Sequence, residues 1–126
     1  MFRDTKAFSG FSVDDLAAAK AFYGDLLGIG VTEGDMGILT LELGGGERPT
    51  VVYPKPNHEP ASFTVLNFPV ADVAGTVAAL RERGVEFERY EGSPVETGDD
   101  FVFRGGGPLI AWFKDPAGNI LSVIEE

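Results

Sequence analysis

The order of the expected secondary-structure elements repeats within this chain, and the repeat limits the folds that the chain can adopt. Adding 57 to a residue number places Phe11 on Phe68, and an offset of 56 places Gly28 on Gly84. Past a longer loop in the second half, an offset of 70 aligns the later strands. Each half then has the order strand, helix and three strands, which predicts two βαβββ modules in an α+β fold.

A single module of this kind cannot cover both faces of its own sheet. We therefore expect one domain over residues 1–126, in which a first module (1–56) packs with a second (61–126). The connecting segment 54–60 is rich in proline, so it is stiff and not a flexible tether.

Capping and stop residues mark the two expected helices. Apolar residues recur at helical spacing after Asp15 and again after Asp72, and Gly28 and Gly84 end the two segments. Runs of β-forming residues between turn signals predict strands at 7–13, 30–33, 38–43, 50–53, 63–70, 86–90, 109–114 and 120–124.

The charge and the cysteine content exclude several classes of function. Asp and Glu number 20 against 10 Lys and Arg, a formal net charge of −10, which disfavours binding to nucleic acid or to anionic lipid. The chain has no Cys, which removes disulfides, thiolate catalysis and sulfur-ligated metal. No apolar run approaches the ~18 residues of a membrane span, so we expect a cytoplasmic protein without a membrane segment.

Two segments carry a more specific signal. The segment FSVDDLAAAKAFYGDLLGIGV, residues 11–31, resembles the first module of the vicinal oxygen chelate superfamily, and AWFKDPAGNILSVIEE, residues 111–126, resembles its closing hairpin. This superfamily includes glyoxalase I, extradiol dioxygenases and bleomycin-resistance proteins. The resemblance implies two βαβββ modules around one central cleft, often in a homodimer.

The resemblance also implies where a divalent metal would bind, and the residues at those positions do not suit one. The ligand positions lie seven residues before the Asp that opens each helix, at Phe8 and Val65. They also lie three residues past Asn119, at Ser122, and at its repeat partner Val52. Three of these four side chains have no lone pair, so we expect no metal and no cofactor. The chain then resembles the metal-free members, which bind a small molecule and sequester it.

Strand alternation predicts the cleft wall, which is mainly apolar and aromatic with a few polar groups. Such a wall suits a small organic ligand held by stacking and a few hydrogen bonds. With Val52 added as the partner of Ser122, the predicted wall consists of Phe8, Thr40, Glu42, Val52, Phe63, Val65, Asn67, Trp112 and Ser122.

Each polar or aromatic candidate also has a structural interpretation. Trp112 either stacks on a ligand or fills space between the sheets. Glu42 either acts as an acid or base or is a solvated side chain on an open strand face. Asn67 either binds ligand or bridges backbone groups.

The rim of the cleft has its own candidates. His58 is the only His and lies in the Pro-rich connector, either as a surface residue or as a ligand contact at the rim. The Gly-rich loop before residue 109 is a candidate flap, with Phe101 or Phe103 as its apolar tip. Ser12 and Ser122 have no His at plausible spacing, so the sequence gives no support for a serine nucleophile.

Three functions fit these observations. The first is metal-free binding of a toxic aromatic or cationic compound, since an acidic chain favours a cation. The second is a lyase or isomerase that uses Glu42 or a non-standard metal site. The third is a subunit whose sheet faces a protein partner. The sequence does not decide whether any reaction is catalysed.

Overall fold

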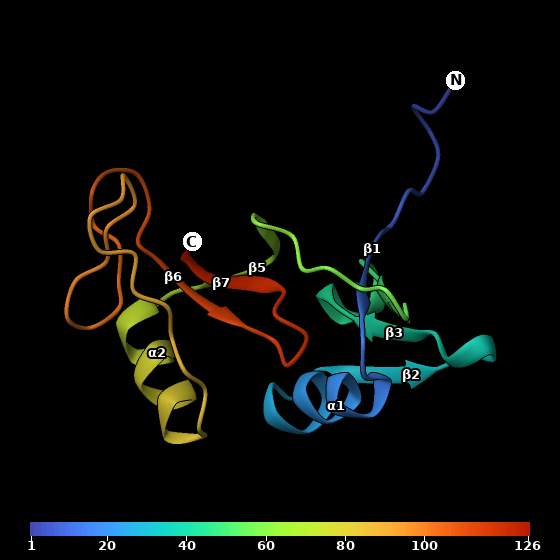
Figure 1. The fold of residues 1–126 in the computed structure, drawn as a ribbon. Helices are drawn as coiled ribbons and strands as arrows, with labels where there is room; N and C mark the ends of the chain where they lie inside the picture. Colours follow the sequence, from blue (N-terminus) through green and yellow to red (C-terminus); the bar gives the residue numbers. More distant parts are fainter. The chain divides into compact units, whose positions relative to one another are not determined.

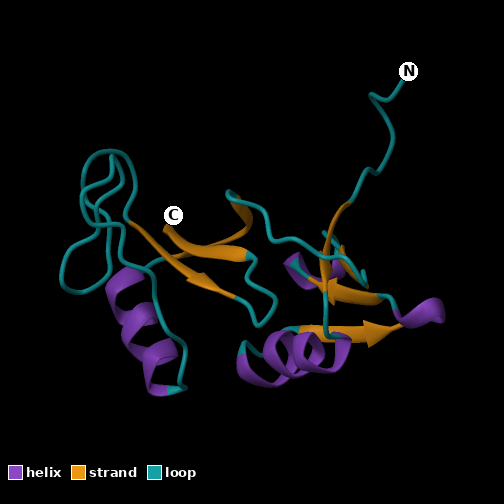
Figure 2. Ribbon diagram, viewed as in Figure 1, coloured by secondary structure: helices purple, strands orange, loops and turns teal.

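Two modules with the same opening order of elements make up the computed structural model, which describes residues 1–126. The chain divides into a first module, Met1–Pro60, and a second module, Ala61–Glu126. Figures 1 and 2 show a sheet and a helix in each module, and an extended N-terminal arm that runs away from the start of β1.

The first module contains one mixed sheet of four strands in the order β1-β4-β3-β2. Strands β1 and β4 are parallel, whereas β3 is antiparallel to both of its neighbours. Its elements are β1 (Ser9–Val13), α1 (Leu16–Lys20), the π-helical turn η1 (Ala21–Leu26), β2 (Gly30–Glu33), η2 (Asp35–Gly37), β3 (Leu39–Glu42), η3 (Gly44–Gly46) and β4 (Thr50–Pro54).

A buried row of side chains crosses this sheet and meets the helical segment. Phe11, Val52 and Leu39 lie opposite one another on β1, β4 and β3. Phe11 packs on the fully buried Tyr23 of η1, with 5.9 Å between ring centroids. This face of the sheet is therefore the core of the first module, as strand alternation predicts.

The second module has a sheet of three strands in the order β5-β7-β6. Strands β5 and β7 are parallel, and β6 is antiparallel to β7. The helix packs against β6 and β7. Its elements are β5 (Thr64–Val70), α2 (Val73–Glu82), β6 (Ile110–Lys114) and β7 (Ile120–Glu125).

The strand predicted at 86–90 does not form. Backbone pairing of this segment with β6 is limited to one bridge, from Phe87 to Phe113, and a hydrogen bond from the Glu88 N–H to the Trp112 carbonyl (2.8 Å). At the start of β6, Ile110 forms a backbone bridge with Phe103 instead. The edge of β6 is thus shared by two short segments, and neither continues as a strand.

The helix boundaries confirm the capping predictions. Asp15 accepts from the N–H of Ala18 at 3.0 Å, and Asp72 accepts from that of Gly75 at 2.9 Å. Gly84 follows α2 with a φ of 92°, the left-handed region where a glycine carries no steric cost.

Strand pairing corrects the repeat offset in the last strand of each module. Val52 lies opposite Phe11 on β4, and Val123 lies opposite Phe68 on β7. The offset there is 71, the difference between 123 and 52, and not 70. Because side chains alternate along a strand, an error of one residue moves a position to the other face of the sheet.

Val52 is the residue that this correction affects. The counterpart of Ser122 is Val51, which lies opposite Thr40. Val52 is fully buried in the core row. The prediction that Val52 shares a face with Thr40 and Glu42 is therefore wrong.

A buried carboxylate organises the turn between β6 and β7. Asp115 Oδ1 accepts from the backbone N–H groups of Ala117 (3.0 Å) and Asn119 (2.8 Å), and Oδ2 accepts from Asn119 Nδ2 (3.0 Å). The turn places β7 antiparallel to β6, so the register of the second sheet depends on it.

We predict that Asp115→Ala lowers the free energy of unfolding by about 3 kcal/mol, because it removes the hydrogen bonds that the buried carboxylate accepts from Ala117 and Asn119. Chemical denaturation followed by circular dichroism would measure the change. Asp99→Ala is the matched control, since the Asp99 carboxylate is exposed, and it should change stability by less than about 0.5 kcal/mol. Equal effects of the two substitutions would contradict the role given to Asp115.

Candidate functional site

A polar row crosses the second sheet on the face opposite to its core. Asn67, Ser122 and Trp112 lie side by side on β5, β7 and β6. The fully buried Ser122 hydroxyl donates to Asn67 Oδ1 at 2.5 Å, and Trp112 Nε1 donates to Thr64 Oγ1 at 3.1 Å. We refer to Thr64, Asn67, Trp112 and Ser122 as the Trp112 row.

The row differs from the predicted wall at one end. Thr64 lies opposite Ile120, and the register shifts before Leu66, so Val65 is an inserted residue of a β-bulge. The insertion interrupts the alternation that places Phe63 and Val65 in line with Asn67. Thr64 takes that place, and Phe63 lies before the strand with 68% of its surface exposed.

Two further aromatic rings cover Trp112. Tyr90 approaches its indole edge-on at 5.3 Å between centroids, and Phe103 lies at 6.1 Å with a tilted ring. As a result only 9% of the Trp112 surface is exposed. Phe103 comes from the Gly-rich loop, so one of the two predicted flap residues contacts the predicted wall.

The other predicted flap residue lies elsewhere. Phe101 packs on Phe87 at 6.5 Å, and the guanidinium of Arg81 lies over its ring at 4.6 Å. Phe87 in turn packs on Phe113, whose side chain alternates with that of Trp112 along β6. Phe101 therefore belongs to the α2 side of the second sheet, away from the Trp112 row.

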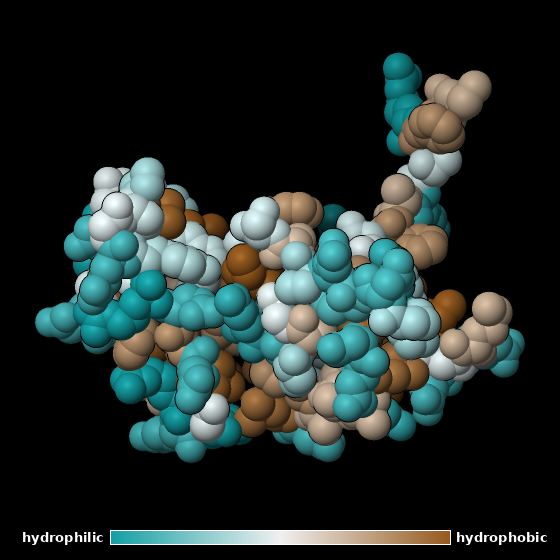
Figure 3. Space-filling model, viewed as in Figure 1, coloured by the Kyte–Doolittle hydropathy of each residue, from teal (hydrophilic) through white to brown (hydrophobic).

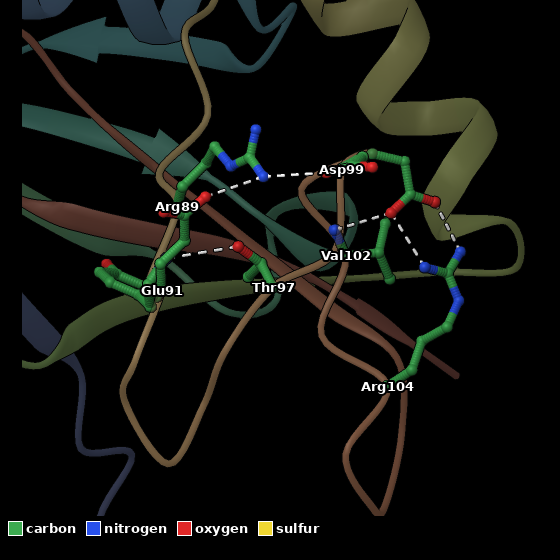
Figure 4. A network of polar contacts seen from close by, with 8 residues as sticks. Arg89, Glu91, Thr97, Asp99, Val102 and Arg104 are labelled. Carbon is green, nitrogen blue, oxygen red and sulfur yellow. Dashed lines mark hydrogen bonds and ion pairs between the residues drawn. The ribbon is translucent and has the colours of Figure 1, made fainter.

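Ion pairs cross-link the loop that carries these rings (Figure 4). Arg89 pairs with Asp99 at 3.1 Å and with Glu91 at 3.0 Å. Arg104 donates to both oxygens of Asp100, at 2.9 and 2.6 Å. This bidentate pair lowers the pKa of the Asp100 carboxyl. The loop therefore has defined internal contacts close in sequence to both Tyr90 and Phe103.

Tyr90 is the titratable group of this aromatic cluster. Burial raises the pKa of its phenol, and the carboxylate of Glu88 raises it further. Lys114, which pairs with Glu88 at 3.1 Å, partly offsets these effects. The neutral phenol is thus favoured beside Trp112.

The non-core face of the first sheet is more exposed than the Trp112 row. Thr40 lies on this face, and Glu42 is an exposed side chain whose carboxylate accepts from Thr32 Oγ1 at 3.0 Å. Glu42 therefore lacks the apolar enclosure of a catalytic carboxylate. The face also has little space beside Gly10, because a Cβ there would lie 2.6 Å from Val51 Cγ2.

Phe8 does not join this face within the sheet. It precedes β1 and has 68% of its surface exposed. Figure 3 shows apolar side chains on the N-terminal arm to which it belongs. Phe2, also in this arm, is 74% exposed.

Sequence reasoning missed one polar pair in the first module. Ser12 Oγ lies 2.6 Å from Nδ1 of His58, so the expectation that Ser12 has no His partner is wrong. The signal was available in the topology. Because β1 and β4 are parallel neighbours in a βαβββ module, the segment after β4 returns past the end of β1.

Comparisons with known proteins agree with the fold and the repeat. The model of the Glyoxalase/Bleomycin resistance protein/Dioxygenase superfamily matches residues 9–123, and the chain belongs to this superfamily. None of the curated protein sequences matches the chain. No helix is both long enough and apolar enough to cross a membrane.

Solved structures with this fold include an antibiotic binding protein and a fosfomycin resistance protein. The chain is 26% identical to TnmS3, an antibiotic binding protein from Streptomyces sp. CB03234, with 97% of each chain covered and a TM-score of 0.67. It is 13% identical to FosX, a fosfomycin resistance protein from Listeria monocytogenes, over 95% of this chain and 91% of that one, with a TM-score of 0.67. A superfamily member from Sphaerobacter thermophilus DSM 20745 is 22% identical over 95% and 97%, with a TM-score of 0.66.

The residues at the metal positions implied by the superfamily do not fit a metal. Phe8, Val65 and Val51, the corrected partner, have hydrocarbon side chains. Ser122 offers a single hydroxyl, which already donates to Asn67. No group of three or more His, Asp or Glu side chains comes together in either module. The donor set therefore provides no chelating site.

We predict that the phenol of Tyr90 titrates above its ordinary pKa and that Glu88→Gln moves this pKa down. Spectrophotometric titration of tyrosinate, with Tyr90→Phe to assign the signal, would measure both. Since the raised pKa favours the protonated folded state, the stabilisation is complete below pH 10 and is lost as the pH rises through the folded pKa. An unchanged Tyr90 titration in Glu88→Gln would contradict this account.

Proposed function

We propose that the chain is a metal-independent small-molecule-binding protein of this superfamily and that it sequesters an aromatic or cationic compound at the Trp112 row. The observation that carries the proposal is the combination of three aromatic rings, from Tyr90, Phe103 and Trp112, with the polar groups of the row. Such a mixture of stacking surface and a few fixed polar atoms is typical of sites for small organic ligands.

Two polar groups of the row can donate hydrogen bonds to a ligand. Asn67 Oδ1 already accepts from Ser122, so the Asn67 amide nitrogen can donate to a carbonyl or ether oxygen. The Thr64 hydroxyl accepts from Trp112 Nε1, which orients it as a donor. The row therefore favours a ligand with hydrogen-bond acceptors along one edge of an aromatic ring system.

Access to the row depends on Phe103. Its ring lies against Trp112, and Arg104 separates it from the glycines Gly105, Gly106 and Gly107. A glycine run of this kind lets the backbone after Arg104 change conformation, while the Phe103 backbone stays bonded to Ile110 and its ring can turn. We infer that a ligand ring either takes the place of Phe103 or stacks between the two aromatic side chains.

The charge of the chain favours a cation. The formal net charge is −10. TnmS3 is described as an antibiotic binding protein, which supports binding rather than catalysis in a relative of similar length. A homodimer, the assembly that the resemblance implies, is part of the proposal, and size-exclusion chromatography with light scattering would test it.

We predict that N-methylacridinium, a planar aromatic cation, quenches the fluorescence of Trp112, the only Trp in the chain. Binding should be weaker for anthracene-2-carboxylate, an anion of similar shape. Trp112→Phe should weaken acridinium binding about tenfold by calorimetry, because it removes indole stacking area and the bond to Thr64. Phe101→Leu, on the other side of the sheet, is the matched control and should bind normally. Tighter binding of the anion would contradict the cationic preference.

We also predict that protein purified without added metal contains no stoichiometric divalent ion by elemental analysis, and that EDTA leaves ligand binding unchanged. Thermal unfolding should not shift with Zn²⁺, Mn²⁺, Ni²⁺ or Fe²⁺, whereas a ligand at about 100 times its Kd stabilises by ~2.7 kcal/mol. One bound metal per chain, with loss of binding in EDTA, would overturn metal independence and favour an enzyme.

A further inference from the structure

The pair formed by Ser12 and His58 is not used by the proposed binding function. Ser12 is on β1, on the face opposite to the core, and His58 is in the connector after β4. Their contact of 2.6 Å is short for a hydroxyl and an imidazole nitrogen. Both residues are partly buried, so a small molecule can reach them.

Local structure holds the imidazole at the end of β1. The N–H of Lys55 donates to the Val13 carbonyl at 2.9 Å, which continues the β1–β4 pairing past Pro54. The N–H of His58 then donates to the Lys55 carbonyl at 3.0 Å and closes a turn. The main chain thus fixes His58 independently of its side-chain bond to Ser12.

The orientation of the pair suits proton transfer. In the tautomer with its proton on Nε2, the His58 ring accepts at Nδ1 from the Ser12 hydroxyl. A hydroxyl held by an imidazole acceptor is the arrangement that activates serine as a nucleophile. Tyr53 lies opposite Ser12 on β4 and is 39% exposed, so an aromatic surface adjoins the pair.

We propose that Ser12 accepts an acyl group from an activated aryl ester, with His58 as its general base. Ser12 Oγ attacks the ester carbonyl carbon while His58 Nδ1 takes the hydroxyl proton. The bond from carbonyl carbon to aryl oxygen breaks, and the aryloxide leaves with the electron pair. The products are an ester on Ser12 and a free phenolate, and the imidazolium then releases its proton to water. This inference does not rest on the proposed ligand-binding function.

The test is the reaction of the full-length protein with 4-nitrophenyl acetate. We expect a burst of 4-nitrophenolate of about one equivalent per chain, as in other acyl-enzyme reactions. Intact mass and peptide mapping should then place a single acetyl group on Ser12. Ser12→Ala should abolish the burst and the adduct, and His58→Gln should slow acylation about a hundredfold. Ser9→Ala, an exposed serine on the same strand, is the matched control and should react normally.

Far-UV circular dichroism of each variant separates loss of reaction from loss of fold. If Ser12→Ala unfolds, Ser12→Val takes its place, since it also removes the hydroxyl. If His58→Gln unfolds, His58→Asn takes its place. Acetylation confined to lysines or the N-terminal amine would overturn the proposal. A burst as large as that of the wild type from folded Ser12→Ala would also overturn the proposal, because the adduct would then be on His58 itself. An unchanged rate in folded His58→Gln would show that the contact only fastens the connector to β1.

Discussion

The parallel pairing of the first and last strands closes each module, and the other features described here depend on it. In the first module β4 lies between β1 and β3, and in the second β7 lies between β5 and β6. A parallel pair needs a crossover connection, so the helix must follow the first strand and pack on one face of the sheet. That packing decides which alternate residues are core and which face away from the helix.

The same pairing generates both polar sites. In the second module it brings Asn67 beside Ser122, whose neighbour on the next strand is Trp112. In the first module it returns the chain after β4 to the end of β1 and places His58 against Ser12. Residues separated by 55 and 46 positions in the sequence are thus brought together by one topological rule.

Much of the fold follows from the sequence because local signals and long-range packing agree there. The capping aspartates and the stop glycines mark both helices, and seven of the eight predicted strands form, with ends that differ by a residue or two. The segment 86–90 has residues suited to a strand, but it shares the edge of β6 with Phe103. The two segments compete for backbone pairing with that edge. The β-strand propensity of a segment does not reveal such competition, because the competition depends on where a distant loop lies.

The candidate site is less predictable because side-chain direction depends on counting residues correctly. Asn67, Trp112 and Ser122 share a face as alternation predicts, since no irregularity lies between them. Val52 and Val65 do not follow the prediction, one through a single-residue error in the repeat offset and the other through a bulge. Neither feature leaves a mark in composition or periodicity. The Ser12–His58 pair, in contrast, could be predicted from the topology of a βαβββ module alone.

The close packing at Gly10 has a consequence for how the two halves of the repeat can change. Gly10 and Val51 occupy the places that Asn67 and Ser122 occupy in the second module. Any side chain at residue 10 meets Val51 first, so a larger residue there requires residue 51 to be smaller or to shift. Changes at these two positions are therefore coupled in the first module, and the two halves are not equally free to acquire a polar row.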